Sequence, residues 1–290
     1  MPPAIPHPAE PLVLLVDNGS LAPAATLSLR ALAARLTDTT GREIRPVSLL
    51  HASAVDPALL EGVAGEILEP TLRRLAAEGR IDIVILPLFL GPSRALTEYV
   101  PERVRHLRQT WPALRVRLAP CLVNAAEPSD LRVATMLVDN IQAVAKVHGW
   151  ARPAVAVVDH GSPQRAVTAV RDWVTHQVET ILGGWARRVA ACSMERRPEP
   201  AYDFNEPLLE KLLETPEFAA GEVVVARLFL QPGRHAGPGG DIEQIIQAAE
   251  ARHPGLAIAC TEPLASHPGL IPLLAERLEQ GLGANATVLG

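Results

Sequence analysis

The sequence has few aromatic residues and no long apolar segment. Aromatic side chains make up 3% of the 290 residues, so aliphatic packing has to fill the core. No stretch approaches the roughly 20 consecutive apolar residues that a membrane-spanning helix requires. The first residues also lack the basic region and apolar run of a signal peptide, so we expect a cytoplasmic protein that does not bind membranes.

Cysteine and basic residues are also scarce. Cys121, Cys192 and Cys260 form no CxxC pair, which argues against a zinc ribbon or a redox motif and favours buried free thiols. The net charge of −5 argues against a nucleic-acid partner, which requires a basic surface. No glycine pattern of the phosphate-binding types is present. With 48% hydrophobic and 20% charged residues, the composition is that of a globular protein.

Short apolar runs alternate with helical patterns along the whole chain. This alternation predicts parallel sheets built from strand-helix-strand units, and therefore an α/β fold. The expected strands are 12–16, 45–50, 81–90, 116–118, 155–159, 189–192, 223–230 and 257–260. The expected helices are 23–36, 57–78, 99–109, 131–147, 165–182, 206–213, 241–251 and 270–282.

The second half of this pattern repeats the first. Asp17-Asn18-Gly19-Ser20 matches Asp159-His160-Gly161-Ser162, and Leu88-Phe89-Leu90 matches Leu228-Phe229-Leu230, at an offset of about 140 residues. We therefore expect two tandem doubly wound parallel-sheet domains, residues 1–149 and 150–290, with a cleft between them. Ligands bind such sheets at the carboxyl ends of the strands.

The two copies differ at the positions best suited to chemistry. The second copy has His160 and His235 where the first has Asn18 and Ala95. A single histidine at a strand end is more often a hydrogen-bonded structural residue, but two at matched strand ends favour a shared site. We therefore expect one working site, in the second domain, and a degenerate copy in the first.

His160 and His235 are expected to bind a divalent metal together with Glu195. Imidazole suits iron, cobalt, nickel and zinc, and Glu195 follows the neighbouring strand, where it can act as a ligand or a general base. The alternative for Glu195 is a solvated loop carboxylate, since glutamate is usually exposed. The remaining histidines, including His51, are expected at the surface or at helix caps.

Arginines gather around the same strand ends. Surface exposure is the simpler explanation, but a lining of the cleft would suit a polycarboxylate substrate. We expect substrate contacts from these arginines and from the small residues of the neighbouring loops: Gly161, Ser162, Arg196, Arg197, Arg227, Gly233 and Arg234. The glycine-rich run from Gly233 could form a mobile lid.

These motifs together resemble the sirohydrochlorin chelatases, the small ATP-independent class II cobaltochelatases and ferrochelatases. The resemblance rests on the strand followed by His160-Gly161-Ser162, on Met194-Glu195, and on Phe229-Leu230 with Gly233 and His235 before an Asp-Ile helix. It covers the whole chain. One departure is Arg227, which stands where the first half has Pro87.

The resemblance implies insertion of Co²⁺ or Fe²⁺, possibly Ni²⁺, into sirohydrochlorin, a tetrapyrrole with eight carboxylates. It assigns the metal to His160 and His235 and the acidic role to Glu195, and it implies no ATP, no organic cofactor, and a monomer or homodimer. Two alternatives remain open. One is a tetrapyrrole or metal carrier without turnover, which needs no base, and the other is a two-lobed small-molecule binding protein that closes about a hinge.

Overall fold

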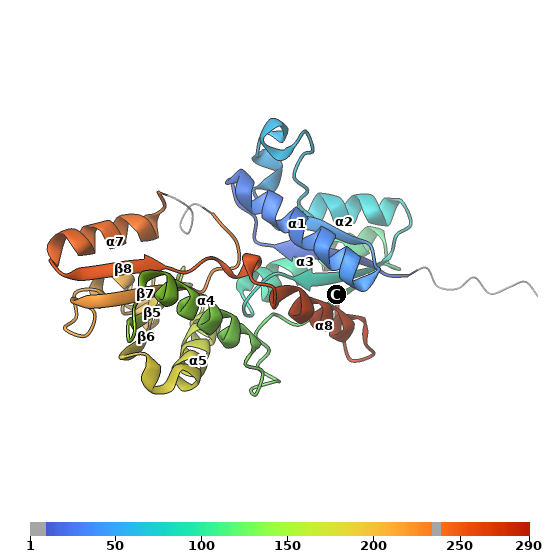
Figure 1. Cartoon of the computed structure of the whole chain (residues 1–290). Coiled ribbons are helices and arrows are strands. Elements are labelled where there is room, and N and C mark those ends of the chain that lie inside the picture. Colours follow the sequence, from blue (N-terminus) through green and yellow to red (C-terminus); the bar gives the residue numbers. More distant parts are fainter. Residues whose placement is uncertain (1–9, 234–238) are drawn as a thin grey trace, which may run out of the picture.

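A computed structural model describes residues 10–233 and 239–290, which form two α/β lobes (Figure 1). The first lobe contains a sheet of order β2-β1-β3-β4-β9, in which β9 is antiparallel and the other strands are parallel. Its strands are β1 (Leu12–Asp17), β2 (Ile44–Ser48), β3 (Asp82–Pro87), β4 (Arg115–Leu118) and β9 (Thr287–Leu289).

The second lobe contains a fully parallel sheet of order β6-β5-β7-β8. Its strands are β5 (Ala154–Asp159), β6 (Arg188–Ser193), β7 (Gly221–Arg227) and β8 (Leu256–Cys260). Leaving β9 aside, each sheet has its first strand between the second and the third, so the two lobes repeat one topology. The prediction of two parallel-sheet α/β domains is confirmed.

Helices cover both faces of each sheet. In the first lobe, α1 (Pro23–Thr40) lies on one face, and α2 (Leu68–Ala77) and α3 (Val100–Thr110) lie on the other. In the second lobe, α5 (Arg165–Leu182) lies on one face, and α6 (Leu209–Leu212) and α7 (Asp241–Arg252) lie on the other. Short helical segments connect them: η1 (Ala52–Ala54), η2 (Pro57–Leu60), η3 (Ala95–Tyr99), η4 (Gly183–Trp185), η5 (Pro200–Asn205) and η6 (Leu264–Ser266).

The last helix of each sequence half crosses to the other lobe. Helix α4 (Arg132–His148) packs on β7 and α5, while α8 (Leu270–Leu282) packs on α1 and β3, as Figure 1 shows. The strand β9 follows α8 into the first sheet. A division at residue 149 therefore separates the parallel strands of the two sheets, but not the helices that cover them.

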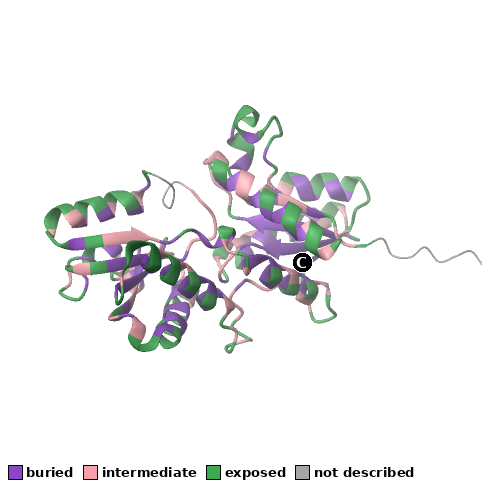
Figure 2. Ribbon diagram, in the orientation of Figure 1, coloured by how far each residue is buried: buried purple, intermediate pink, exposed green. Residues whose placement is uncertain are grey.

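This exchange gives the lobes a shared hydrophobic core. Val13 and Leu15 of β1 belong to the same buried cluster as Val155 and Val157 of β5, and α4 and α8 both contribute to it. Figure 2 shows that the buried residues lie on the strands and on parts of the helices. No helix of the described residues is long and apolar enough to cross a membrane.

Two predicted helices were wrong in extent. The helix expected over 57–78 is broken because Glu61 and Gly62 adopt positive φ (59° and 83°), and α2 begins only at Leu68. The helix expected over 206–213 is reduced to α6, because Glu206 precedes a proline and is extended. No apolar pattern in the sequence predicted the short strand β9.

Two predicted strands also end early. The strands expected over 81–90 and 223–230 stop at Pro87 and Arg227, so that both Leu-Phe-Leu segments leave their sheets. The expected free thiols are confirmed: Cys192 is buried, and Cys121 and Cys260 are half-buried. Burial raises the pKa of the Cys121 thiol to about 12 and that of the Cys260 thiol to about 11, so neither is a reactive thiolate.

Candidate functional site

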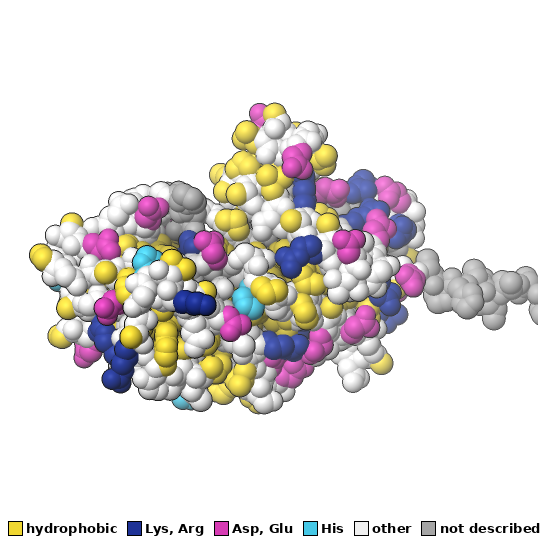
Figure 3. All heavy atoms as spheres, viewed as in Figure 1, with side chains coloured by type: hydrophobic (Ala, Val, Ile, Leu, Met, Phe, Trp, Pro, Cys, Tyr) yellow, Lys and Arg dark blue, Asp and Glu magenta, His cyan; other side chains and the backbone are white. Residues whose placement is uncertain are grey.

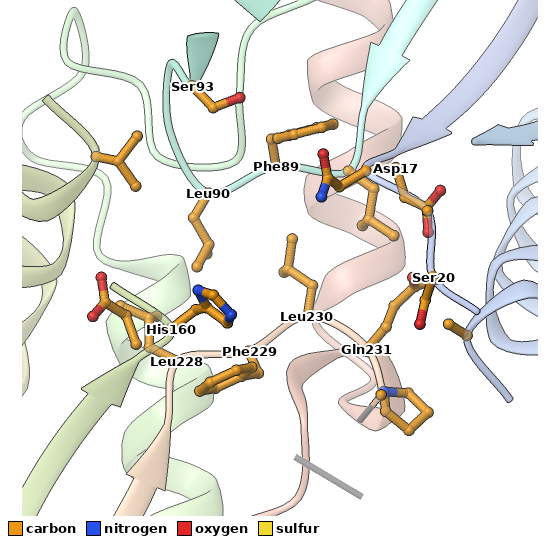
Figure 4. Close-up of a pocket in the computed structure, with 18 of the residues that line it drawn as sticks. Asp17, Ser20, Phe89, Leu90, Ser93, His160, Leu228, Phe229, Leu230 and Gln231 are labelled. Carbon is orange, nitrogen blue, oxygen red and sulfur yellow. The ribbon is translucent and has the colours of Figure 1, made fainter. Parts of the chain in front are cut away.

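A cavity of about 600 Å³ lies between the lobes at the carboxyl ends of β1, β3, β5 and β7. Both sequence halves line it. Figure 4 shows Asp17, Ser20 and Gln231 along one side and His160 along the other, with Leu90 and Leu230 between them. The position agrees with the predicted cleft, and the volume is that of a small-molecule site.

The apolar lining comes from the two Leu-Phe-Leu segments. The Leu88 amide donates to the carbonyl of Val16 (2.7 Å), and the Leu228 amide donates to the carbonyl of Val158 (2.8 Å). These matched hydrogen bonds attach the start of each segment to the neighbouring strand, and residues 88–90 and 228–230 line the cavity. The result is an apolar, largely aliphatic surface to which both halves contribute.

His160 and Glu195 lie side by side after neighbouring strands. The Nε2 atom of His160 is 3.5 Å from Oε1 of Glu195, and the two side chains are 46% and 59% exposed. Two ligands bound to one metal at about 2.1 Å and near-tetrahedral angles are roughly 3.4 Å apart, so this spacing suits a shared ion. His160 lines the cavity, and Glu195 stands beside it outside the lining.

Gly161 makes this approach possible. Its φ is +92°, and a Cβ atom added to it would lie 1.9 Å from the carbonyl oxygen of Glu195. The Glu195 amide in turn donates to the carbonyl of His160 (3.1 Å). Any side chain at position 161 would push the loop that carries Glu195 away from His160.

A buried polar network fixes the His160 loop from behind. Asp159 Oδ1 accepts hydrogen bonds from the Ser193 hydroxyl (2.6 Å) and from the Gly161 amide (3.1 Å). Arg171, on α5, is 3% exposed; it donates to Ser193 Oγ (2.5 Å) and lies 3.9 Å from Asp159. Burial still raises the pKa of Asp159, although Ser193 and Arg171 oppose the effect.

Asn205 supports the next residue of the same loop. Its side chain is fully buried, accepts from the Ser162 amide (2.9 Å) and donates to the Ser162 carbonyl (2.9 Å). The Ser162 hydroxyl accepts from the Gln164 amide at the start of α5 (3.1 Å). Ser162, predicted to contact substrate, does not line the cavity.

The first half forms the facing wall with the same backbone and different side chains. The amide of Leu50 donates to the carbonyl of Asn18 (3.3 Å), as Glu195 does to His160. Gly19 has a φ of +83°, and an added Cβ would lie 1.8 Å from the Leu50 carbonyl oxygen. Asn18 and Leu50 thus occupy the positions that match the two proposed ligands.

His51 also lines this wall, which the sequence did not indicate. It precedes the helical segment η1 with φ 66° and ψ −36°, and the Ala52 amide donates to the Leu50 carbonyl (2.8 Å). This is a γ-turn with positive φ, a rare and strained conformation. Gly65 packs against it, because a Cβ at Gly65 would lie 2.5 Å from the Ala52 oxygen.

Three of the predicted substrate-binding arginines do not line the cavity. Arg196 pairs with Glu206 (2.7 Å) and Asp203 (3.0 Å), and Arg197 stacks on Tyr202 (5.3 Å to the ring). Arg227 donates to the Thr261 carbonyl and is 13% exposed. Local acceptors therefore hold all three, and substrate contacts by them stay a prediction.

The glycine-rich loop is described only in part. Gly233 lines the cavity as predicted, while Arg234 and His235 lie outside the described residues. Within residues 10–233 and 239–290, no three His, Cys, Asp or Glu side chains gather as a metal site. The described part of the expected metal site is the pair His160 and Glu195.

Buried polar residues around the loops were missed at the sequence level. Asp17 and Asp159 end matched strands, and both line the cavity. Their recurrence in the two Asp-x-Gly-Ser motifs was a usable signal. Arg171 and Asn205 had no such signal, because a polar residue within a helix or a loop is usually exposed.

The CbiX family model matches this chain over residues 12–131 and 154–281. No match was found among curated protein sequences. Among solved structures, SirB from Bacillus subtilis with Fe³⁺ is similar at 13% identity and a TM-score of 0.69, over 93% of this chain and 94% of SirB. SirB from B. subtilis subspecies spizizenii with cobalt is similar at 14% identity and a TM-score of 0.66, over 94% of this chain and 96% of that SirB. A CbiX described as the terminal enzyme for siroheme biosynthesis in denitrifying bacteria is similar at 18% identity and a TM-score of 0.60, over 94% of this chain and 100% of that CbiX.

Proposed function

Because the chain belongs to the CbiX family, we propose that it is a sirohydrochlorin chelatase that inserts Co²⁺ or Fe²⁺ into the tetrapyrrole. The observation that carries the proposal is the pair His160 and Glu195, 3.5 Å apart beside a cavity of about 600 Å³. The resemblance to SirB and CbiX structures, including SirB with iron and with cobalt, supports it.

The chemistry requires a metal ligand and a base on one ring face. His160 and Glu195 receive the divalent ion, and Glu195 takes a proton from a pyrrole nitrogen as that nitrogen binds the ion. His235 is proposed as the third ligand. The metal is a substrate in this scheme, and no ATP or organic cofactor takes part.

The cavity suits a flat, largely apolar ring with polar margins. We propose that the macrocycle lies against the two Leu-Phe-Leu segments and that Gly161 and Gly233 allow its close approach. Its carboxylate arms extend beyond the cavity toward Arg196, Arg197 and Arg227, and Arg234 is proposed as a further contact. The intermixed acidic and basic side chains of the visible surface (Figure 3) do not suggest a polyanionic macromolecule as the partner.

The test is to mix purified protein with sirohydrochlorin and Co²⁺, Fe²⁺ or Ni²⁺ and to follow the absorption spectrum. We expect insertion well above the spontaneous rate, with the metal preference read from the three rates. Glu195→Gln separates an enzyme from a carrier, because it removes the base but keeps the size of the side chain. Tight substrate binding without insertion by the wild type would favour the carrier.

A further inference from the structure

Asp17 and Asp159 are matched residues in different electrostatic surroundings. Each ends the central strand of its lobe, and each is buried, at 6% and 7% exposure. Asp159 has Arg171 at 3.9 Å, whereas the matched position on α1 is Leu29. Among the described residues, Asp17 has no ion pair. Its negative charge therefore has no positive partner, whereas Arg171 provides one for Asp159.

The carboxylate of Asp17 receives one well-formed hydrogen bond from a side chain. Gln231, with its amide oriented to satisfy both ends, donates to Oδ2 (2.7 Å) from the opposite half of the chain. Oδ1 is buried and receives no hydrogen bond of normal geometry from the described residues, although the Ser48 hydroxyl and the Gly19 amide lie near enough to the carboxylate to lower its pKa. A buried acceptor without a donor is costly, and such exceptions require an explanation.

Asp17 also faces the candidate metal site across the cavity. Figure 4 shows Asp17 and Gln231 on the side opposite His160. A macrocycle held between the two walls turns one face toward His160 and the other toward Asp17. Resting on the proposed function, we propose that Asp17 accepts the second of the two protons that leave the tetrapyrrole as the metal enters.

The proton balance supports two acceptors. Insertion breaks two N–H bonds; both electron pairs stay on nitrogen and bind the divalent ion, and two protons leave. Glu195 takes one on the metal face. The other goes to the carboxylate of Asp17, which becomes a neutral carboxylic acid and later releases its proton to water. No oxidant, reductant or further reactant is needed.

The surroundings of Asp17 favour this role. Burial raises its pKa from 3.8 to about 6, although Ser48 and Gly19 oppose the shift, so it is mostly ionised at neutral pH and readily protonated. The other titratable or charged groups that line the cavity are His51, on the loop after β2, Asp159 and His160, at the end of β5, and Arg171, on α5. The lining residues of α1 and of the two Leu-Phe-Leu loops carry no charge.

The experiment compares Asp17→Asn with the wild type in cobalt insertion between pH 5 and pH 8. The amide keeps the shape of the carboxylate and cannot accept a proton. We expect kcat to fall at least about tenfold at pH 7.5, with sirohydrochlorin binding changed less than about twofold. The ratio of wild-type to variant kcat should approach one at pH 5, where Asp17 is already protonated, and rise to a plateau above pH 7. Asp38→Asn, an exposed carboxylate on α1, serves as the control and should match the wild type.

Each outcome decides the inference. An unchanged kcat at pH 7.5, a ratio independent of pH, or a loss confined to substrate binding would overturn it. Thermal melts of both variants show whether Asp17→Asn is folded, which we expect because it removes a buried charge. If the wild type itself inserts no cobalt, the proposed function fails; if only Asp17→Asn behaves as the wild type, the role of Asp17 alone fails.

Discussion

The loops at residues 17–20 and 159–162 share a backbone and differ in chemistry. Both have a buried aspartate, a glycine with positive φ, and a hydrogen bond from the loop after the adjacent strand. One carries Asn18 beside Leu50, and the other carries His160 beside Glu195. The backbone constraint is present in both copies, whereas the side chains proposed to bind metal are present in one.

The comparison also shows what supports each loop. Arg171 and Asn205 fill the space behind the second loop with hydrogen bonds, whereas the position matched to Arg171 in the first half is the buried, apolar Leu29. A loop that must hold a metal ligand in one orientation benefits from such a rigid support. The first loop carries no proposed metal ligand. Its Asp17 lines the cavity and has no ion-pair partner among the described residues.

The largest expected effect comes from converting the second loop to the first. His160→Asn should reduce cobalt insertion by about 10³-fold, because it removes the proposed metal ligand. The fold should be retained, since asparagine already occupies the same backbone position at Asn18. Insertion rates and a thermal melt check this. Asn18→Ala is a matched exchange in the other copy, and a loss as large as that of His160→Asn would contradict the assignment of the working copy.

Arg171→Leu makes the support of the second loop resemble that of the first. It should lower the free energy of unfolding by about 3–5 kcal/mol, because it leaves Asp159 buried without its counter-charge. Urea denaturation measures the change. Adding Asp159→Asn should restore part of the lost free energy of unfolding, because the buried carboxylate without a counter-charge is then absent.

Arg165→Leu, on the same helix, is the control for Arg171→Leu. Arg165 is exposed and lies over Phe204 at 4.6 Å, so its loss should cost about 1 kcal/mol or less. If the two variants had equal effects, the network behind His160 would not be the source of stability.

The sequence predicted the sheets well because strands buried on both faces leave a strong local signal. The runs 12–16 and 155–159 are β1 and β5 almost to the residue. The exchange of α4 and α8 was not predictable, because periodicity shows that a helix has an apolar face but not which sheet covers it. The same limit applies to Arg196 and Arg197: a local cluster is visible in the sequence, while the partners Glu206 and Tyr202 are not.

The charge of Asp17 should appear as a pH dependence of stability that the variant lacks. Because its folded pKa is raised from 3.8 to about 6, its contribution to stability is complete below pH 3.8 and is lost as the pH rises through 6. That shift corresponds to about 3 kcal/mol at pH 7.5. Asp17→Asn should therefore gain about 2.5 kcal/mol relative to the wild type between pH 4 and pH 7.5, by urea denaturation at each pH. A constant difference would show that Asp17 is not desolvated.

The smallest effect should come from rebuilding the site in the first half. Asn18→His with Leu50→Glu places an imidazole and a carboxylate on the backbone that brings His160 and Glu195 to 3.5 Å. Leu50 is 44% exposed, so a glutamate there should be tolerated. Because Ala95 stands at the position matched to His235, the new site lacks a third ligand. We expect one additional Co²⁺ bound weakly, about tenfold tighter than in Asn18→His with Leu50→Gln, by calorimetry. An unchanged number of Co²⁺ ions bound per chain would mean that the loops at 17–20 and 159–162 do not place equivalent side chains in the same way.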